Sequence, residues 1–300
     1  MFKNLMSNNL KIKISVLFFL VLIFIFLIKD NLLQKYKSFS DEKRKIEITK
    51  DFKISKNLND FFNAQTEFEN KLIAHAGGSV SGEIYTNSLE AVNKSILNGF
   101  KLIELDLLVS RDNKLISLHD WGSFSKKTNC CQTENIPISH NMFMDQKYSG
   151  LKVIDFELIN KIFSNNNELI LVTDKTNNFD LINQQLTFDK SRIIVEIFGR
   201  ENYFNAIISG IKNPMLSVRA SDIPFVRKYN VKLVAVHSNE LEIHREKFSK
   251  LKKEDGVFIF VYSTNDINFI KKNKVAATAF YTDFLSPKRF VCEEKKCTTY

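Results

Sequence analysis

Glu104 and Asp106 stand two residues apart in the stretch LIELDLLV, whose other members are all apolar. Residues two apart in a β-strand point to the same face, so both carboxylates would enter one environment. Like charges this close repel each other, and burial raises the pKa of at least one unless a cation neutralises them. The sequence therefore predicts a divalent metal, Mg²⁺ or Ca²⁺, held by these two residues and by Asp174 at the end of another apolar run. The open alternative is an exposed pair, or an ion pair with Lys101 or Lys175.

Two histidines follow apolar runs in the same way: His75 ends LIAH, and His119 ends LISLH. Histidine is the side chain whose ordinary pKa suits proton transfer near neutral pH. Two histidines beside a metal-bound oxyanion could hydrolyse or transfer a phosphate ester, one taking a proton from the nucleophile and the other giving one to the leaving oxygen. Asp120 either orients His119 or caps the turn that follows.

Short runs rich in β-branched residues and leucine alternate with helical patterns, an order typical of parallel strands with crossover helices. The eight candidate strands cover residues 72–75, 102–109, 169–174, 193–198, 215–220, 232–237, 257–262 and 277–282. Eight such units in roughly 230 residues predict a (β/α)₈ TIM barrel, whose catalytic groups gather at the carboxyl ends of the strands. The alternative, an open doubly wound sheet, would need a Gly-rich phosphate-binding turn after a strand, and none of the candidate strands is followed by one.

An uncharged apolar run, ISVLFFLVLIFIFLI, covers residues 14–28 and has lysines on both sides. A membrane span usually needs about 20 residues, and the core of a signal peptide has about 7 to 15. Because no small-x-small cleavage signature follows the run, we predict an uncleaved transmembrane signal anchor over residues 1–30. Residues 31–68 would then form a charged, membrane-proximal stalk, and residues 69–300 the barrel.

This anchor would make the chain a single-pass membrane protein with its barrel outside the cytoplasm. Its four cysteines, Cys130, Cys131, Cys292 and Cys297, would then face an oxidising compartment and could form disulfides in three alternative pairings. The net charge of +9 comes with lysines scattered along helices and the stalk. Without a basic cluster interleaved with aromatic residues, we expect no nucleic-acid partner.

The stretch IAHAGG…YTNSLEAVNKSILNGFKLIELDLLVSRDNKLISLHDW resembles the signature of the glycerophosphodiester phosphodiesterase family. In that family a His-Arg-Gly start, an Asn-Thr-x-Glu-Ala helix start, Glu-x-Asp and a closing His-Asp occur in this order. The match covers residues 71–121 closely, and LVTDKT, VYSTND and FYTDFLSP are similar to later family elements. The resemblance implies a (β/α)₈ barrel, a metal held by Glu104, Asp106 and an acid on the third strand, and His75 and His119 as acid and base.

The sequence departs from the family pattern at two places. Ala76 stands where the family has an arginine that contacts phosphate, and Asp174 directly precedes Lys175 where the family has a glutamate two residues before the lysine. Losing a bidentate guanidinium is not a conservative change. Lys175, or Arg219 at the end of the fifth strand, could supply the positive charge in substrate binding. Residues 122–150 take the place of the family's substrate-facing insertion, so the alcohol recognised need not be glycerol.

The leading hypothesis is a membrane-anchored, metal-dependent phosphoric diester hydrolase. Its substrate would be a small phosphodiester with a glycerophosphodiester-like bond, or that group in a lipid headgroup or an envelope polymer. One alternative is a lipid phosphodiesterase of the phospholipase C or sphingomyelinase D type, in which a substrate hydroxyl attacks and leaves a cyclic phosphate. The other is a catalytically silent barrel that acts as a binding module, for which Ala76 is the argument.

Overall fold

The computed structural model describes residues 37–299 except 38, 66, 263, 294 and 295. The chain divides into two compact units, Met1–Lys50 and Asp51–Tyr300. In the first unit, residues 39–50 are helical. The predicted signal anchor lies outside the described residues. Within the described part of the chain, no helix combines the length and the apolar character needed to cross a bilayer.

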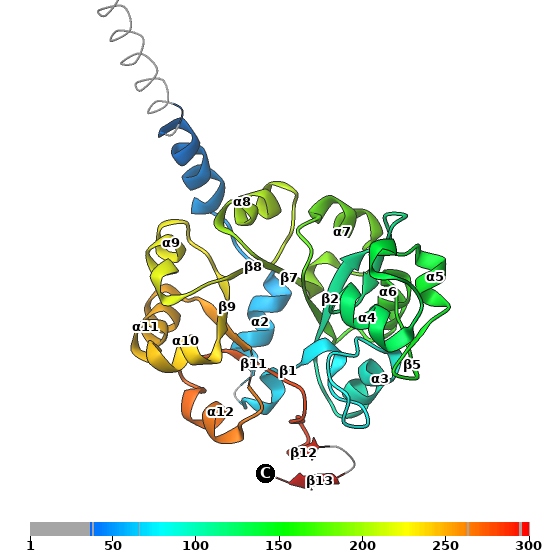
Figure 1. The fold of residues 1–300 in the computed structure, drawn as a ribbon. Coiled ribbons are helices and arrows are strands. Elements are labelled where there is room, and N and C mark those ends of the chain that lie inside the picture. The colour runs from blue at the N-terminus through cyan, green and yellow to red at the C-terminus, as the bar shows by residue number, and fades with distance from the viewer. Residues whose placement is uncertain (1–36, 38, 66, 263, 294–295, 300) are drawn as a thin grey trace, which may run out of the picture. The chain divides into compact units, whose positions relative to one another are not determined.

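The second unit is built on a closed ring of parallel strands (Figure 1). In ring order these are β1 (Leu72–Ala74), β2 (Leu102–Val109), β6 (Ile170–Asp174), β7 (Ile193–Ile197), β8 (Pro214–Ser217), β9 (Leu233–His237), β10 (Phe258–Tyr262) and β11 (Ala279–Thr282). Pairing of β1 with both β11 and β2 closes the ring. The predicted eight-stranded parallel barrel is therefore confirmed, because each apolar run is long enough for one buried strand.

Helices connect the strands along the outside of the barrel (Figure 1). They are α3 (Leu89–Leu97), α6 (Phe156–Asn165), α7 (Phe179–Gln185), α8 (Arg200–Ile208), α9 (Ile223–Lys228), α10 (Ser238–Ile243), α11 (Arg245–Asp255) and α12 (Ile267–Asn273). Local chemistry explains several of the starts: Ser88 and Asp155 each accept a hydrogen bond from a backbone N–H in the first turn of α3 and α6. After β11, the described residues form the antiparallel pair β12 (Phe290–Glu293) and β13 (Lys296–Thr299) instead of an eighth crossover helix.

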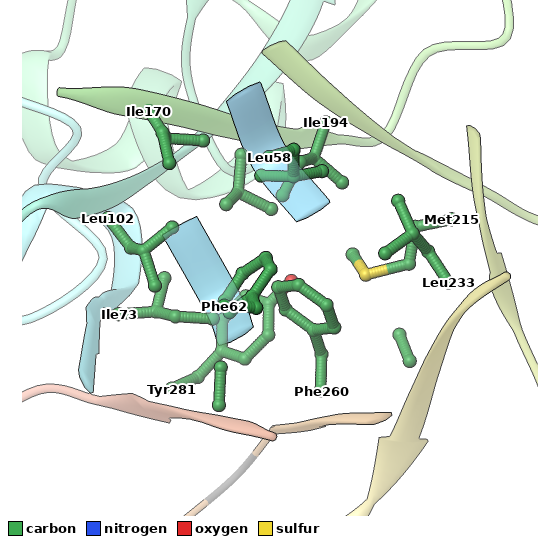
Figure 2. Close-up of a cluster of buried hydrophobic side chains, with 13 residues drawn as sticks. Leu58, Phe62, Ile73, Leu102, Ile170, Ile194, Met215, Leu233, Phe260 and Tyr281 are labelled. Atoms are coloured by element: carbon green, nitrogen blue, oxygen red, sulfur yellow. The ribbon is translucent and has the colours of Figure 1, made fainter. Parts of the chain in front are cut away.

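A further helix, α2 (Lys56–Ala64), closes the amino-terminal opening of the barrel. Figure 2 shows Leu58 and Phe62 of α2 among residues that begin strands, such as Leu102 and Leu233. Both helix residues are almost fully buried, at 1% and 3% exposed. The prediction of a stalk over residues 31–68 is therefore wrong from Asp51 onward: four-residue spacing places the two apolar side chains on one helix face, and that face completes the core.

Between β2 and α6 the chain forms an insertion with its own small core. Its elements are β3 (Leu115–Ser117), which runs antiparallel to β2, then α4 (Trp121–Thr128), α5 (His140–Met144), β4 (Lys147–Tyr148) and β5 (Leu151–Lys152). Cys130 and Cys131 pack against this core as free thiols, with Sγ atoms 2.6 Å apart. In β12 and β13, Cys292 stands directly opposite Cys297 in the strand register. The disulfide pairing stays a prediction.

Candidate active site

Three acidic side chains meet at the carboxyl ends of two neighbouring strands. Glu104 and Asp106 lie on β2 and are 2% and 1% exposed, and Asp174 ends β6. The register of these strands sets Asp106 beside Asp174. One oxygen from each of the three residues lies within 4.8 Å of the others. The structure thus brings together the three residues that the sequence proposed as metal ligands.

Only part of this acidic cluster is satisfied by hydrogen bonds. Glu104 Oε2 accepts from the backbone N–H of Ala76 at 2.7 Å, and Asp106 Oδ2 accepts from the Asn87 side-chain amide at 2.7 Å. Glu104 Oε1 and Asp174 Oδ1 are buried and have no hydrogen-bond partner. Burial, followed by the negative charge of Asp106, raises the pKa of both Glu104 and Asp174 well above the usual range. Unpartnered buried oxygens on adjoining carboxylates fit Mg²⁺ or Ca²⁺, because these ions bind oxygen ligands and offset the repulsion.

Lys175 is the cation that the fold places beside these acids. Its φ of +66° lies in the left-handed region, which breaks the alternation of a strand. Its Nζ therefore lies 3.6 Å from Asp106 Oδ1 and 3.7 Å from Asp174 Oδ2, although Asp174 is the preceding residue. Burial acts to lower the pKa of Lys175, but the carboxylates outweigh it and raise that pKa. Arg219 instead lies exposed after β8, where its backbone N–H donates to Asp222.

Both predicted histidines are oriented by a carboxylate. His75 follows β1 at the start of a 3₁₀ turn, and its Nδ1 lies 3.0 Å from Asp283 Oδ1. His119 Nδ1 lies 3.1 Å from Asp120 Oδ2. Asp120 Oδ1 also accepts from the N–H of Ser123, so this aspartate both orients the histidine and caps α4. A carboxylate at Nδ1 fixes the tautomer and leaves Nε2 of each ring for proton transfer.

A tyrosine lies between the two histidines. The ring of Tyr85 meets that of His75 edge to face, with centroids 4.7 Å apart, and that of His119 in a similar way at 4.8 Å. A cavity of about 380 Å³ opens beside His119 and is lined in part by Tyr85, Asp120 and Tyr148. It borders the imidazole on which the proposed proton transfer depends, whereas larger cavities lie elsewhere on the barrel unit.

A fourth acid lies inside the barrel. Glu196 on β7 is 5% exposed, and the Tyr281 hydroxyl donates to its Oε2 at 3.3 Å. Burial raises the pKa of Glu196 to about 7, and hydrogen bonds from Tyr281 and Ser217 only partly oppose this effect.

Sequence reasoning also missed Asp283, Tyr85 and Asn87 as members of the site. Asp283 has a recognisable signal, because it directly follows a barrel strand, where polar side chains reach the catalytic rim. Asn87 stands at the helix start of the motif already noted, one residue before the capping residue Ser88. Tyr85 lies in a loop and carries no periodic signal. Its role follows from contacts alone.

Comparison with known proteins agrees with this geometry. Residues 75–193 match the model of the Glycerophosphoryl diester phosphodiesterase family. A search of curated proteins found no match. Among solved structures, a glycerophosphodiester phosphodiesterase from Thermotoga maritima is similar at 19% identity and a TM-score of 0.58, over 73% of this chain and 96% of that one. One from Parabacteroides distasonis is similar at 18% identity and a TM-score of 0.57, over 72% and 94%.

At such identities the solved structures show a shared fold, and the family model adds the motif residues. The matched region begins at His75 and includes both histidines and all three clustered acids. The resemblance seen in the sequence is thereby confirmed. Residues 75–193 match the model of the glycerophosphoryl diester phosphodiesterase family, and this match, together with the barrel fold, supports an enzyme of the phosphodiesterase class.

Proposed function

We propose that this chain is a metal-dependent hydrolase of a glycerophosphodiester-like bond and that His75 and His119 are its general acid and base. One observation carries the proposal: two histidines, each oriented at Nδ1 by a carboxylate, accompany three clustered acids and one lysine at the carboxyl ends of barrel strands. Folding a barrel requires none of these groups at its rim.

Each group has a role in hydrolysis of a phosphodiester. Glu104, Asp106 and Asp174 would hold the divalent ion, which when bound neutralises charge on the phosphoryl oxygens. Lys175 adds a second positive charge for the phosphate. One histidine takes a proton from the attacking water as the new P–O bond forms. The other donates a proton to the alcohol oxygen as the old P–O bond breaks, and the carboxylate behind each ring stabilises its charged form.

The test is turnover of a panel of phosphodiesters by the full chain, with added Mg²⁺ or Ca²⁺ and with excess chelator. Glycerophosphodiesters, a lysophospholipid and an envelope-type glycerol phosphate polymer cover the substrate classes. Turnover that chelation abolishes supports the proposal, and full activity in chelator excludes the metal site. Phosphorus NMR of the product separates water attack, which leaves a phosphomonoester, from attack by a substrate hydroxyl, which leaves a cyclic phosphate.

Ala76 favours the competing hypothesis of a silent binding module. Its side chain is fully buried, so it cannot contact a phosphate, and its contacts with the site come from its backbone: the N–H donates to Glu104 and the carbonyl accepts from Asn87. Binding of a diester without turnover, under every metal condition, would establish that module. Ala76→Arg is the companion variant: a gain in turnover would mean that the family phosphate geometry persists, and we expect none because Lys175 already supplies the charge.

We further propose that residues 14–28 anchor the chain in a membrane as a single-pass protein with the barrel outside the cytoplasm. The uncharged apolar run and its flanking lysines, which can reach the two interfaces, support the anchor. The full chain should sediment with membranes, whereas a chain without residues 1–30 should stay in the supernatant and keep its turnover. A mature protein cut directly after the apolar run would instead identify a signal peptide. An anchored barrel would favour a lipid headgroup or an envelope polymer as substrate.

A further inference from the structure

Tyr85 contacts both histidines of the proposed site with a single ring. Its interplanar angles are 79° with His75 and 64° with His119, at centroid distances of 4.7 and 4.8 Å. These are the edge-to-face arrangements that aromatic pairs prefer. The histidines come from different parts of the chain, one after barrel strand β1 and the other after β3 of the insertion. Tyr85 therefore lies between the two groups that are proposed to act on opposite sides of one phosphate.

A carboxylate at Nδ1 does not by itself hold an imidazole ring in place. Asp283 and Asp120 each hold one atom of a histidine, which leaves the ring free to tilt about that hydrogen bond. A second contact on the ring is needed to fix the direction of Nε2. Tyr85 supplies that second contact to both rings. His75 also meets the ring of Tyr281 edge to face, at the longer centroid distance of 6.0 Å, so Tyr85 is the aromatic contact that the two histidines share.

The backbone at Tyr85 is held in a conformation that a bulky residue seldom adopts. Its φ is +56°, in the left-handed region that favours glycine and asparagine. Backbone hydrogen bonds hold the loop before and after Tyr85. Val80 and Glu83 bond each other reciprocally before it, and after it the Asn87 N–H donates to the Ala76 carbonyl. Strain of this kind persists only where surrounding structure enforces it, and it is concentrated at functional sites.

Resting on the proposed function, we infer that Tyr85 is a positioning residue whose ring sets the orientation of both His75 and His119. The contacts with the two histidines are made by the ring, so a phenylalanine at this position would keep them. The backbone conformation is a separate property, which asparagine retains and which leucine would strain.

Two variants of the full chain separate these contributions. Tyr85→Phe keeps the ring and should leave kcat within about twofold of the parent. Tyr85→Asn keeps the left-handed backbone but removes the ring, and should lower kcat by about 10- to 100-fold with KM changed less than about threefold, because small misplacements of catalytic groups cost this much. A Phe variant as slow as the Asn variant, or a change confined to KM, would overturn the inference.

Ring signals of the histidines in NMR spectra provide a readout that does not need turnover. In Tyr85→Asn the signals of His75 and His119 should both move further than the lost ring current alone accounts for, because each imidazole tilts once the second contact on its ring is gone. His237 is the internal control, because it has its own edge-to-face contact with Tyr262 at 5.3 Å. Unmoved His75 and His119 signals would refute the positioning role. If the parent chain cleaves no diester while these signals move, the proposed function fails and the positioning inference stands.

Discussion

Glu196 contributes to the pH dependence of this barrel's stability, as Glu104 and Asp174 also do, and Glu196→Gln should remove its share. Burial raises the pKa of this carboxyl from 4.5 to about 7, so the folded state holds the proton more tightly than the unfolded state does. The stability that the group contributes is therefore present below about pH 4.5 and is lost as the pH rises through about 7. Glutamine has the same shape, carries no charge and can still accept from the Tyr281 hydroxyl.

The size of the effect follows from the two pKa values. Each factor of ten in proton affinity corresponds to about 1.4 kcal/mol, so Glu196→Gln should raise the free energy of unfolding by about 1 kcal/mol at pH 5 and about 3 kcal/mol at pH 8. Urea unfolding at both pH values measures this difference, in excess chelator so that no bound metal offsets the buried charges. Glu134→Gln is the matched control on an exposed glutamate and should show the same small effect at both pH values. A Glu196→Gln effect that is equal at pH 5 and pH 8 would refute the reasoning.

Three further predictions follow from the site and the core. Mg²⁺ or Ca²⁺ should raise the melting temperature of the chelator-treated chain more at pH 8 than at pH 5, because a metal needs ionised ligands and the pKa of Glu104 is raised. An equal rise in melting temperature at both pH values would contradict the metal site. His75→Ala and His119→Ala should each lower kcat by about 10²- to 10⁴-fold, and a p-nitrophenyl diester, whose leaving group needs no proton, should rescue only the variant that lacks the acid. Phe62→Ala should lower the free energy of unfolding, measured in urea, by about 3–5 kcal/mol. The control Ile243→Ala, at an exposed position, should lower it by less than about 0.5 kcal/mol. A Phe62→Ala effect as small as that of the control would mean that α2 does not complete the core.

Much of the barrel could be predicted from the chain alone, because its signals are local. Each barrel strand is a short apolar run between turn residues, and strand periodicity places Glu104 and Asp106 on one face without knowledge of any partner. The rule that parallel strands end at one rim then predicts that Asp174, His75 and His119 belong to the same region. These inferences require only the residue types, their spacing and one closed sheet.

Tertiary structure decided which distant residues complete the site and the core. Asp283 lies beside His75 although 208 positions separate them in sequence, and Leu58 and Phe62 meet strands from all around the barrel. A hydrogen bond or a buried contact between such residues leaves no periodic mark in either segment. For that reason a polar, lysine-rich segment predicted as a stalk could contain the helix that closes the core.

Sequence alone also does not show which of several candidate residues turns its side chain toward the site. Alternation along a strand would turn Lys175 away from the side that Asp174 faces, yet a left-handed φ brings both side chains to Asp106. Residue types alone left Lys175 and Arg219 equal as candidates for the phosphate-binding charge. The sequence determined the chemical groups available, and the folded backbone decided their partners, because a side chain's direction depends on dihedral angles that long-range packing imposes.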